Sequence, residues 1–184
     1  MNSESSTNPT APSNTPLEHS YYEVGGEMFD KTNALSALIE CSAGGTALVL
    51  CGTKAEADLI EVVLKKRGVA VAKPNVELPT GPKLSLIKQV QNGEISVLVV
   101  TDTLSTGFDP GEFNLLVNYS IPADPEVYLH RMERIGSGQK LTKVASIVGP
   151  NDQANFQFIR KVVGIQIDLK VLPTSEDLFL ARAK

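Results

Sequence analysis

The polar residues best placed for chemistry follow a short apolar run in the middle of the chain. Thr101 and Asp102 come directly after the run at 97–100, and Gly107 and Asp109 follow a few residues later. Polar side chains at the ends of buried strands typically form the ligand-binding edge of an open α/β sheet. Aspartates in such segments also stabilise turns, which is the alternative role here. The pattern predicts a ligand-binding edge or a set of structural turns.

A second group of polar residues is cationic and lies on a helix expected to open at Asp124-Pro125. This helix carries His130 and Arg131, with Arg134 close behind. Arginine presents a planar fork of donors that matches phosphate and carboxylate groups. The alternative is surface pairing with neighbouring glutamates, which contributes little to stability.

A third candidate follows the apolar run at 46–51, which has the length of a buried strand. Gly52 and Thr53 come next and open a helix that Gly68 ends. The amino terminus of a helix suits anions, so one interpretation of this segment is a phosphate contact. Glu56 stands three residues after Thr53, however, and completes a capping box. Capping explains Thr53 without a ligand and is the favoured interpretation.

Short apolar runs alternate with amphipathic segments from Tyr21 onward. Strands are expected at 21–24, 46–51, 68–72, 96–100, 115–119, 143–148 and 165–169, and helices at 31–41, 53–67, 82–92, from 124 onward and at 151–163. We expect the first of these strands at a sheet edge. Such alternation is typical of an α/β fold with a mostly parallel central sheet flanked by helices on both faces.

The first twenty residues differ in composition from the rest of the chain. They are rich in Ser, Thr, Asn and Pro, which predicts a disordered tail or linker at 1–20 and one domain at 21–184. No apolar run approaches the ~18 residues needed to cross a bilayer. The tail has no apolar core of the kind found in secretion signals. We therefore expect no membrane contact.

Charge and cysteine content narrow the function classes. The formal net charge is -4, which argues against a broad nonspecific nucleic-acid surface but permits a few phosphate contacts. Cys41 and Cys51 are too few for a disulfide framework, and we expect both reduced and partly or wholly buried. No Cys/His cluster has metal-ligand spacing, so no metal site is expected.

The order and spacing of these segments, from Tyr21 to Phe179, resemble the second RecA-like lobe of DEAD-box RNA helicases. The resemblance implies a RecA-like, P-loop-NTPase-type lobe. It implies RNA contacts at Gly52, Thr53, Lys83, Thr101 and Asp102, and nucleotide contacts at Gly107, Asp109, Arg131 and Arg134. Arg134 matches an arginine-finger position, where a cation stabilises the transferring phosphoryl group.

Several positions depart from the pattern of that family. Thr106 and Ser137 stand where arginines are usual, Glu133 and Val76 where glycines are usual, and Thr80 and Lys83 in place of a Gln and an Arg. A serine cannot replace a fork of cationic donors. The phosphate loop and magnesium site of the first lobe are absent, and Gly136–Lys140 lacks P-loop spacing. The segment should therefore hold no cofactor alone, and ATP and Mg only together with a first lobe.

These departures lead to a first hypothesis. The chain is a lobe with eroded ATP and RNA motifs that serves mainly for protein association, with weak RNA contact. Tudor-domain, Yb-like proteins of the piRNA pathway contain such lobes, which implies a cytoplasmic location such as an RNA granule. Expected partners are a first RecA-like lobe, other proteins, or a second copy of the chain.

Two further hypotheses remain open. The chain is the catalytic half of an active ATP-dependent RNA helicase whose first lobe lies outside this segment. Alternatively, it is a small-ligand α/β module that uses the same crevice at the carboxyl ends of the strands.

Overall fold

The fold is a single parallel sheet covered by helices on both faces. The computed structural model describes residues 17–42, 44–74, 78–102, 108–133 and 140–183. The strands are β1 (Glu18–Glu23), β2 (Ala47–Cys51), β3 (Val71–Ala72), β4 (Val97–Thr101), β5 (Leu115–Asn118), β6 (Lys143–Val148) and β7 (Asp168–Leu169). The helices are α1 (Asp30–Cys41), α2 (Lys54–Lys66), α3 (Thr80–Gln91), α4 (Pro125–Glu133), α5 (Gln153–Val163) and α6 (Ser175–Arg182), with short 3-10 turns η1 (Pro110–Glu112) and η2 (Pro150–Asp152).

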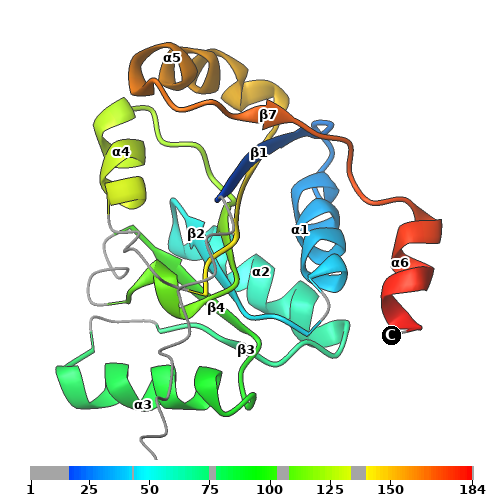
Figure 1. Cartoon of the computed structure of the whole chain (residues 1–184), viewed down its shortest axis with the longest axis vertical. Coiled ribbons are helices and arrows are strands. Elements are labelled where there is room, and N and C mark those ends of the chain that lie inside the picture. Colours follow the sequence, from blue (N-terminus) through cyan, green and yellow to red (C-terminus); the bar gives the residue numbers. More distant parts are fainter. Residues whose placement is uncertain (1–16, 43, 75–77, 103–107, 134–139, 184) are drawn as a thin grey trace, which may run out of the picture.

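The strands pair in the order β3-β4-β2-β5-β6-β1-β7, and every pair is parallel (Figure 1). The central strands are apolar on both sides, as parallel strands covered by helices must be. In β2, Leu48 and Leu50 face one apolar cluster, while Ala47, Val49 and Cys51 face the other. This alternation divides the core into two layers.

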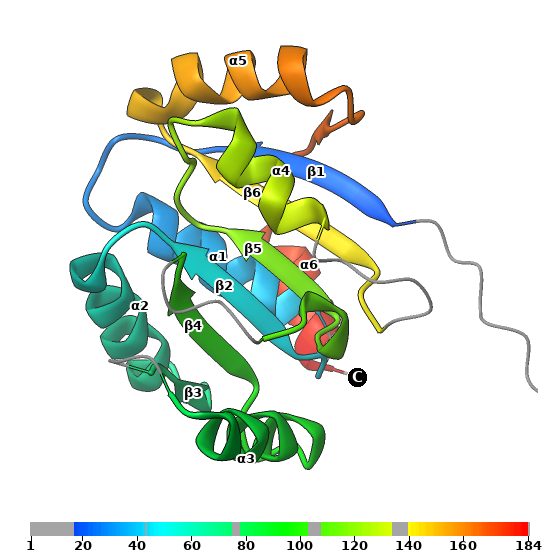
Figure 2. The ribbon, with the colours of Figure 1, turned by 90° about the vertical axis from the view of Figure 1, so that its left-hand side faces the viewer.

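Each layer is closed by its own helices. The side chains of α1 and α2, including Leu35 and Ile60, fill one layer. Those of α4 and α5, including Tyr128 and Phe156, fill the other. Figure 2 shows α4 in front of β5 and β6, with α1 behind the sheet. Helix α6 packs on the outer side of α1 (Figure 1) and has no buried residue of its own.

The mostly parallel sheet with helices on both faces is confirmed. Helix α2 has the expected capping box, and Gly68, at φ +78°, ends it in the left-handed region that glycine adopts without strain. Both cysteines are free thiols; Cys51 is buried and Cys41 half-buried, as expected.

Two expectations about the sheet edge are corrected. The strand expected from Tyr21 begins at Glu18, because Glu18 N already donates to Thr142 O. It is also not an edge strand, because it lies between β6 and β7, and β7 forms the edge as expected. Residues 1–16 of the expected tail lie outside the described residues.

Other boundaries also differ. The strand expected at 68–72 pairs only over Val71–Ala72, and the helix expected at 151–163 opens with a 3-10 turn before α5. Helix α6 was not anticipated. Within the described ranges, no helix is long and apolar enough to cross a membrane, and no group of three His, Cys, Asp or Glu residues could hold a metal ion.

Candidate functional site

Gly52, Thr53, Thr101 and Asp102 lie at the carboxyl ends of β2 and β4, at one edge of the sheet. Register places Cys51 beside Thr101 on one side of β2 and Leu50 beside Asn118 on the other. The segments that follow β2, β4 and β5 therefore leave the sheet side by side. This arrangement confirms that the polar residues after these strands share one edge.

Arg131 and Asp102 bind each other across this edge. Arg131 Nε donates to Asp102 Oδ1 at 2.7 Å, and Nη2 donates to Oδ2 at 2.6 Å. The Arg131 side chain is 3% exposed and that of Asp102 is 38% exposed. This two-point geometry is the strong form of an arginine–carboxylate contact.

Both donors on Arg131 Nη1 are also engaged. Its Nη1 donates to Asn118 Oδ1 at 3.0 Å and to the Ser120 carbonyl oxygen at 3.1 Å. Asn118 in turn donates through Nδ2 to Ser146 Oγ at 3.1 Å. One buried guanidinium thus joins α4 to the ends of β4 and β5, and Asn118 extends the connection to β6.

The amino terminus of α2 is filled by a carboxylate of the chain itself. Glu56 Oε2 accepts from Gly52 N at 2.9 Å, from Thr53 N at 3.1 Å and from Ser120 Oγ at 2.8 Å. Thr53 Oγ1 accepts from Glu56 N and completes the capping box. An anion at these donors would have to displace the Glu56 carboxylate.

Burial keeps two neighbouring groups neutral. The pKa of the Cys51 thiol is raised to about 12, first by burial and then by the charge of Glu56. The pKa of Tyr119 is raised to about 12 by the same two causes in the same order. Near neutral pH these groups add no charge, so among the described residues the carboxylates, Arg131 and Lys31 set the potential of this edge.

Asp109 is exposed and serves a turn. Its Oδ1 accepts from Gly111 N at 2.8 Å and caps η1. The turn role that the sequence offered as an alternative is therefore present, and the role toward nucleotide stays a prediction.

The other predicted contacts are placed only in part. Thr101 ends β4 and is half-buried, and Lys83 lies half-buried in the first turn of α3. Gly107 and Arg134 lie outside the described residues, as do Val76, Thr106 and Ser137. The RNA and nucleotide roles of all these residues remain predictions.

Three residues of this edge were missed by sequence reasoning. Asn118 interrupts an apolar run, and that break was a usable signal for a buried polar network. Ser120 and Lys31 carried no signal. Lys31 Nζ pairs with Asp152 at 2.6 Å and donates to Tyr119 O at 3.1 Å. These contacts lie beside a hollow of about 310 Å³ at the same edge.

Comparison with known proteins agrees with this architecture. The model of the helicase conserved C-terminal domain matches residues 30–139. The ATP-dependent RNA helicase CshA of Listeria monocytogenes is 27% identical over 155 residues, covering 84% of this chain and 30% of its own length. The chain thus spans about 30% of the length of such curated relatives.

Solved structures give the same result. The C-terminal domain of the DEAD-box protein Dbp5 superposes with a TM-score of 0.72 at 24% identity, covering 92% of this chain and 99% of that domain. Saccharomyces cerevisiae Dbp5 bound to RNA and ADP BeF3 superposes with a TM-score of 0.70 at 26% identity, over 90% of this chain and 45% of that protein. The first likeness is one of fold, and it matches the RecA-like lobe expected from the sequence.

Proposed function

Because the chain belongs to the helicase conserved C-terminal domain family, we propose that it is the second lobe of a DEAD-box-like RNA helicase protein, one that acts mainly in protein association and contacts RNA weakly. In this proposal the groups that would bind ATP and RNA have been replaced or engaged internally, while the sheet and its two core layers are retained.

The observation that carries the proposal is the position of Glu56. Its carboxylate takes the two backbone donors, Gly52 N and Thr53 N, that the family resemblance assigns to an RNA phosphate. A negative charge at this point also repels an approaching phosphate. Weak RNA binding is the expected consequence.

Arg131 supports the same interpretation on the nucleotide side. The guanidinium is 3% exposed and already holds Asp102, Asn118 and the Ser120 carbonyl. Moving it toward a phosphate would break both of its hydrogen bonds to the Asp102 carboxylate. Arg131 is better suited to fix α4 on the sheet than to bind ATP.

The fit to a nucleotide is therefore partial. Among the described candidates, Asp109 offers an exposed carboxylate that could accept from ribose hydroxyls. The sequence has no phosphate loop to hold a triphosphate. ATP and Mg, where they are used, would be held chiefly by a first lobe.

An active ATP-dependent RNA helicase is the second candidate function. It is favoured by the 26% identity to Dbp5, which has been solved with RNA and ADP BeF3, and by the 27% identity to CshA. In that case the first lobe supplies the phosphate cradle, and Arg134 reaches the transferring group when the lobes close.

RNA-stimulated ATP turnover by the two-lobed protein separates the two candidates. We expect little turnover, and no change in Arg134→Ala. Brisk turnover that Arg134→Ala abolishes would establish the helicase and remove the association role. The purified 184-residue chain should not hydrolyse ATP in either case.

RNA contact is tested on the chain alone by a salt titration of RNA binding, with Thr101→Ala as the variant. If Thr101 contacts an RNA phosphate, the loss of its hydroxyl weakens RNA binding in the variant. Because this hydroxyl is neutral, the weakening should be similar at every salt concentration.

Self-association belongs to the same proposal, because a lobe without its usual neighbour exposes a former interlobe face. Light scattering that shows a monomer at every concentration would contradict it. A Tudor-domain, piRNA-pathway context in the cytoplasm also stays a prediction, which a search for a Tudor domain in the longer protein checks.

A further inference from the structure

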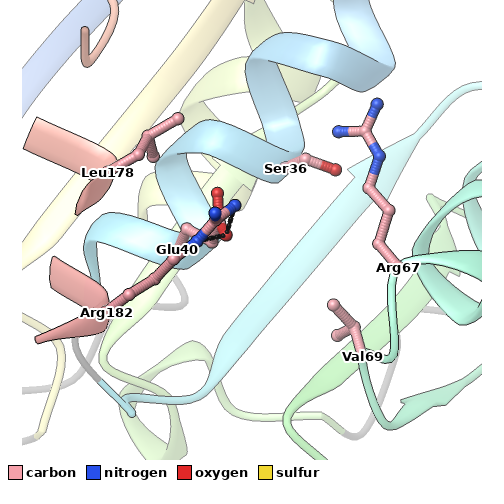
Figure 3. Close-up of a pocket in the computed structure, with 6 residues that line it drawn as sticks. All are labelled: Ser36, Glu40, Arg67, Val69, Leu178 and Arg182. Carbon is pink, nitrogen blue, oxygen red and sulfur yellow. Dashed lines mark hydrogen bonds and ion pairs between the residues drawn. The ribbon is translucent and has the colours of Figure 1, made fainter. Parts of the chain in front are cut away.

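A pocket lies far from the carboxyl edge, between the second half of α1, the end of α2 and helix α6. Its volume is about 460 Å³, within the ~300–1,000 Å³ of typical ligand pockets. It is lined by Ser36 and Glu40 of α1, Arg67 and Val69 at the end of α2, and Leu178 and Arg182 of α6 (Figure 3). No residue predicted to contact RNA or nucleotide takes part in it.

A buried polar group in this pocket has no partner. Ser36 is 6% exposed, and its Oγ makes no hydrogen bond within the described part of the chain. A buried hydroxyl left unsatisfied costs free energy, and such groups are rare in native proteins. In Figure 3 the hydroxyl points to the side of the pocket where the Arg67 guanidinium lies. A ligand acceptor placed between them would satisfy Ser36.

The charges of the lining favour an anionic ligand. Two guanidinium groups face the pocket against one carboxylate. Arg182 is paired with Glu40, with Nη2 to Oε1 at 2.6 Å and Nε to Oε1 at 2.8 Å. Arg67 is oriented by Asn33, a neutral residue that accepts from its Nη2. This contact does not neutralise the charge of Arg67, because Asn33 is uncharged. The Arg67 guanidinium can therefore pair with the carboxylate of a ligand.

The rest of the lining is apolar. Val69 and Leu178 are half-buried and border the pocket from opposite sides in Figure 3. An aliphatic side chain fits between them. The pocket therefore offers an unsatisfied hydroxyl, a guanidinium and two aliphatic side chains. These groups fit a ligand in which a carboxylate lies close to an aliphatic group.

We propose, on the basis of the protein-association role inferred above, that this pocket receives a segment of a partner protein that carries an acidic side chain beside an aliphatic one. The acidic group accepts from Ser36 Oγ and Arg67, and the aliphatic group packs on Val69 and Leu178. Helix α6 forms one wall, so its attachment to α1 controls the shape of the pocket.

The test begins with a library of random dodecapeptides displayed on phage and selected on the full chain. The expected enriched sequences place Asp or Glu beside Leu, Ile or Val. The affinity of the most enriched peptide is then measured by fluorescence anisotropy. Because a charge-assisted hydrogen bond is lost, Arg67→Gln should weaken binding about tenfold or more, and Ser36→Ala about three- to tenfold.

Two features keep this test decisive. Ser36→Ala removes a hydroxyl that has no partner, so this variant keeps its fold. Lys66→Gln removes the same charge from the neighbouring exposed residue, which does not line the pocket, and should bind like wild type. No enrichment, enrichment of basic sequences, or equal affinity for Arg67→Gln would overturn the proposal.

The outcomes also separate this pocket from the proposed function. Peptides that bind wild type and both pocket variants equally would place association elsewhere and remove only the pocket. Brisk, Arg134-dependent ATP turnover by the two-lobed protein would remove the association role, whatever the pocket binds.

Discussion

The Arg131 guanidinium donates two hydrogen bonds to the Asp102 carboxylate, with donor–acceptor distances of 2.7 and 2.6 Å. The family resemblance places Asp102 among RNA contacts and Arg131 among nucleotide contacts, yet in this chain the two groups bind each other. The pair connects the end of β4 to α4. Any movement of α4 toward a ligand must therefore either move Asp102 with it or break this contact.

Asp102→Ala should destabilise the fold. It leaves the buried Arg131 guanidinium without its counter-charge, which for fully buried pairs costs ~3–5 kcal/mol. Because the Asp102 side chain is 38% exposed and solvent compensates in part, we expect about 2 kcal/mol in the free energy of unfolding. Urea unfolding followed by circular dichroism measures it. Asp58→Ala removes a carboxylate that is 52% exposed, and Lys73 keeps Glu61 at 3.7 Å, so this variant should stay near wild type; equal losses in both variants would contradict the assignment.

Glu56→Ala should strengthen RNA binding. The substitution vacates the Thr53 amide, leaves Gly52 N with Ser120 Oγ at 3.0 Å as its remaining acceptor, and removes a negative charge from the amino terminus of α2. For single-stranded RNA, each added phosphate contact should steepen the salt dependence of log K by about 0.7. Anisotropy titrations at several salt concentrations check this. Glu94→Ala removes an equal, exposed charge after α3 and should leave the salt slope unchanged.

The two cysteines should differ in reactivity. Cys51 is fully buried, and its thiol pKa is raised to about 12, so a thiol reagent at pH 8 should not modify it in the folded protein. Half-buried Cys41 should react slowly, because burial raises its pKa as well. Labelling of Cys41→Ser and Cys51→Ser, native and unfolded, distinguishes the two thiols. Fast native labelling of Cys51 would contradict the buried position.

Cys51 should also make stability fall at alkaline pH. The unfolded thiol loses its proton near its ordinary pKa of 9.0, whereas the folded one holds it to about 12. The stabilisation is therefore complete below pH 9.0 and declines as the pH rises toward 12. Urea midpoints measured across this range should decline less steeply in Cys51→Ala.

Asp177→Asn should loosen helix α6. Asp177 Oδ2 accepts from Thr174 N at 2.7 Å and Oγ1 at 2.8 Å, and these bonds lower the pKa of its carboxyl. The contribution is present above the ordinary pKa and is lost as the pH falls through the folded value. Amide hydrogen exchange across residues 175–182 should speed up in the variant. Glu176→Gln removes the neighbouring charge without the cap and should exchange like wild type.

Most strands and helices of this fold could be predicted from local signals. Thr53 and Glu56 indicated the start of α2, and the apolar runs at β2, β4 and β5 had the composition of strands buried on both faces. Glu18 and Ser20 were read as tail because they are polar. The strand that contains them is fixed by pairing with β6, a contact that local sequence does not encode.

The site was predictable only in outline. The carboxyl edge followed from strand order, but the pairing of Arg131 with Asp102 depends on how α4 packs over β5 and β6. The role of Glu56 was predictable only in part. Its capping box is a local sequence pattern, whereas the third donor to its carboxylate, Ser120, follows β5 and is distant in sequence. Helix α6 was missed although Thr174 and Asp177 form a capping box at its start. Its attachment to α1 through Arg182 and Glu40, which are distant in sequence, could not be predicted locally.

The place of β1 in the sheet sets the order in which the nascent chain can fold. Glu18 pairs with Lys143, and β1 lies between β6 and β7, which follow all the other strands of this sheet along the chain. Strand β1 therefore stays unpaired in the sheet until β6 has been synthesised, while β2, β4 and β5 can already assemble. Long waits before non-local pairing slow folding and leave a strand edge exposed to chaperones or to another chain.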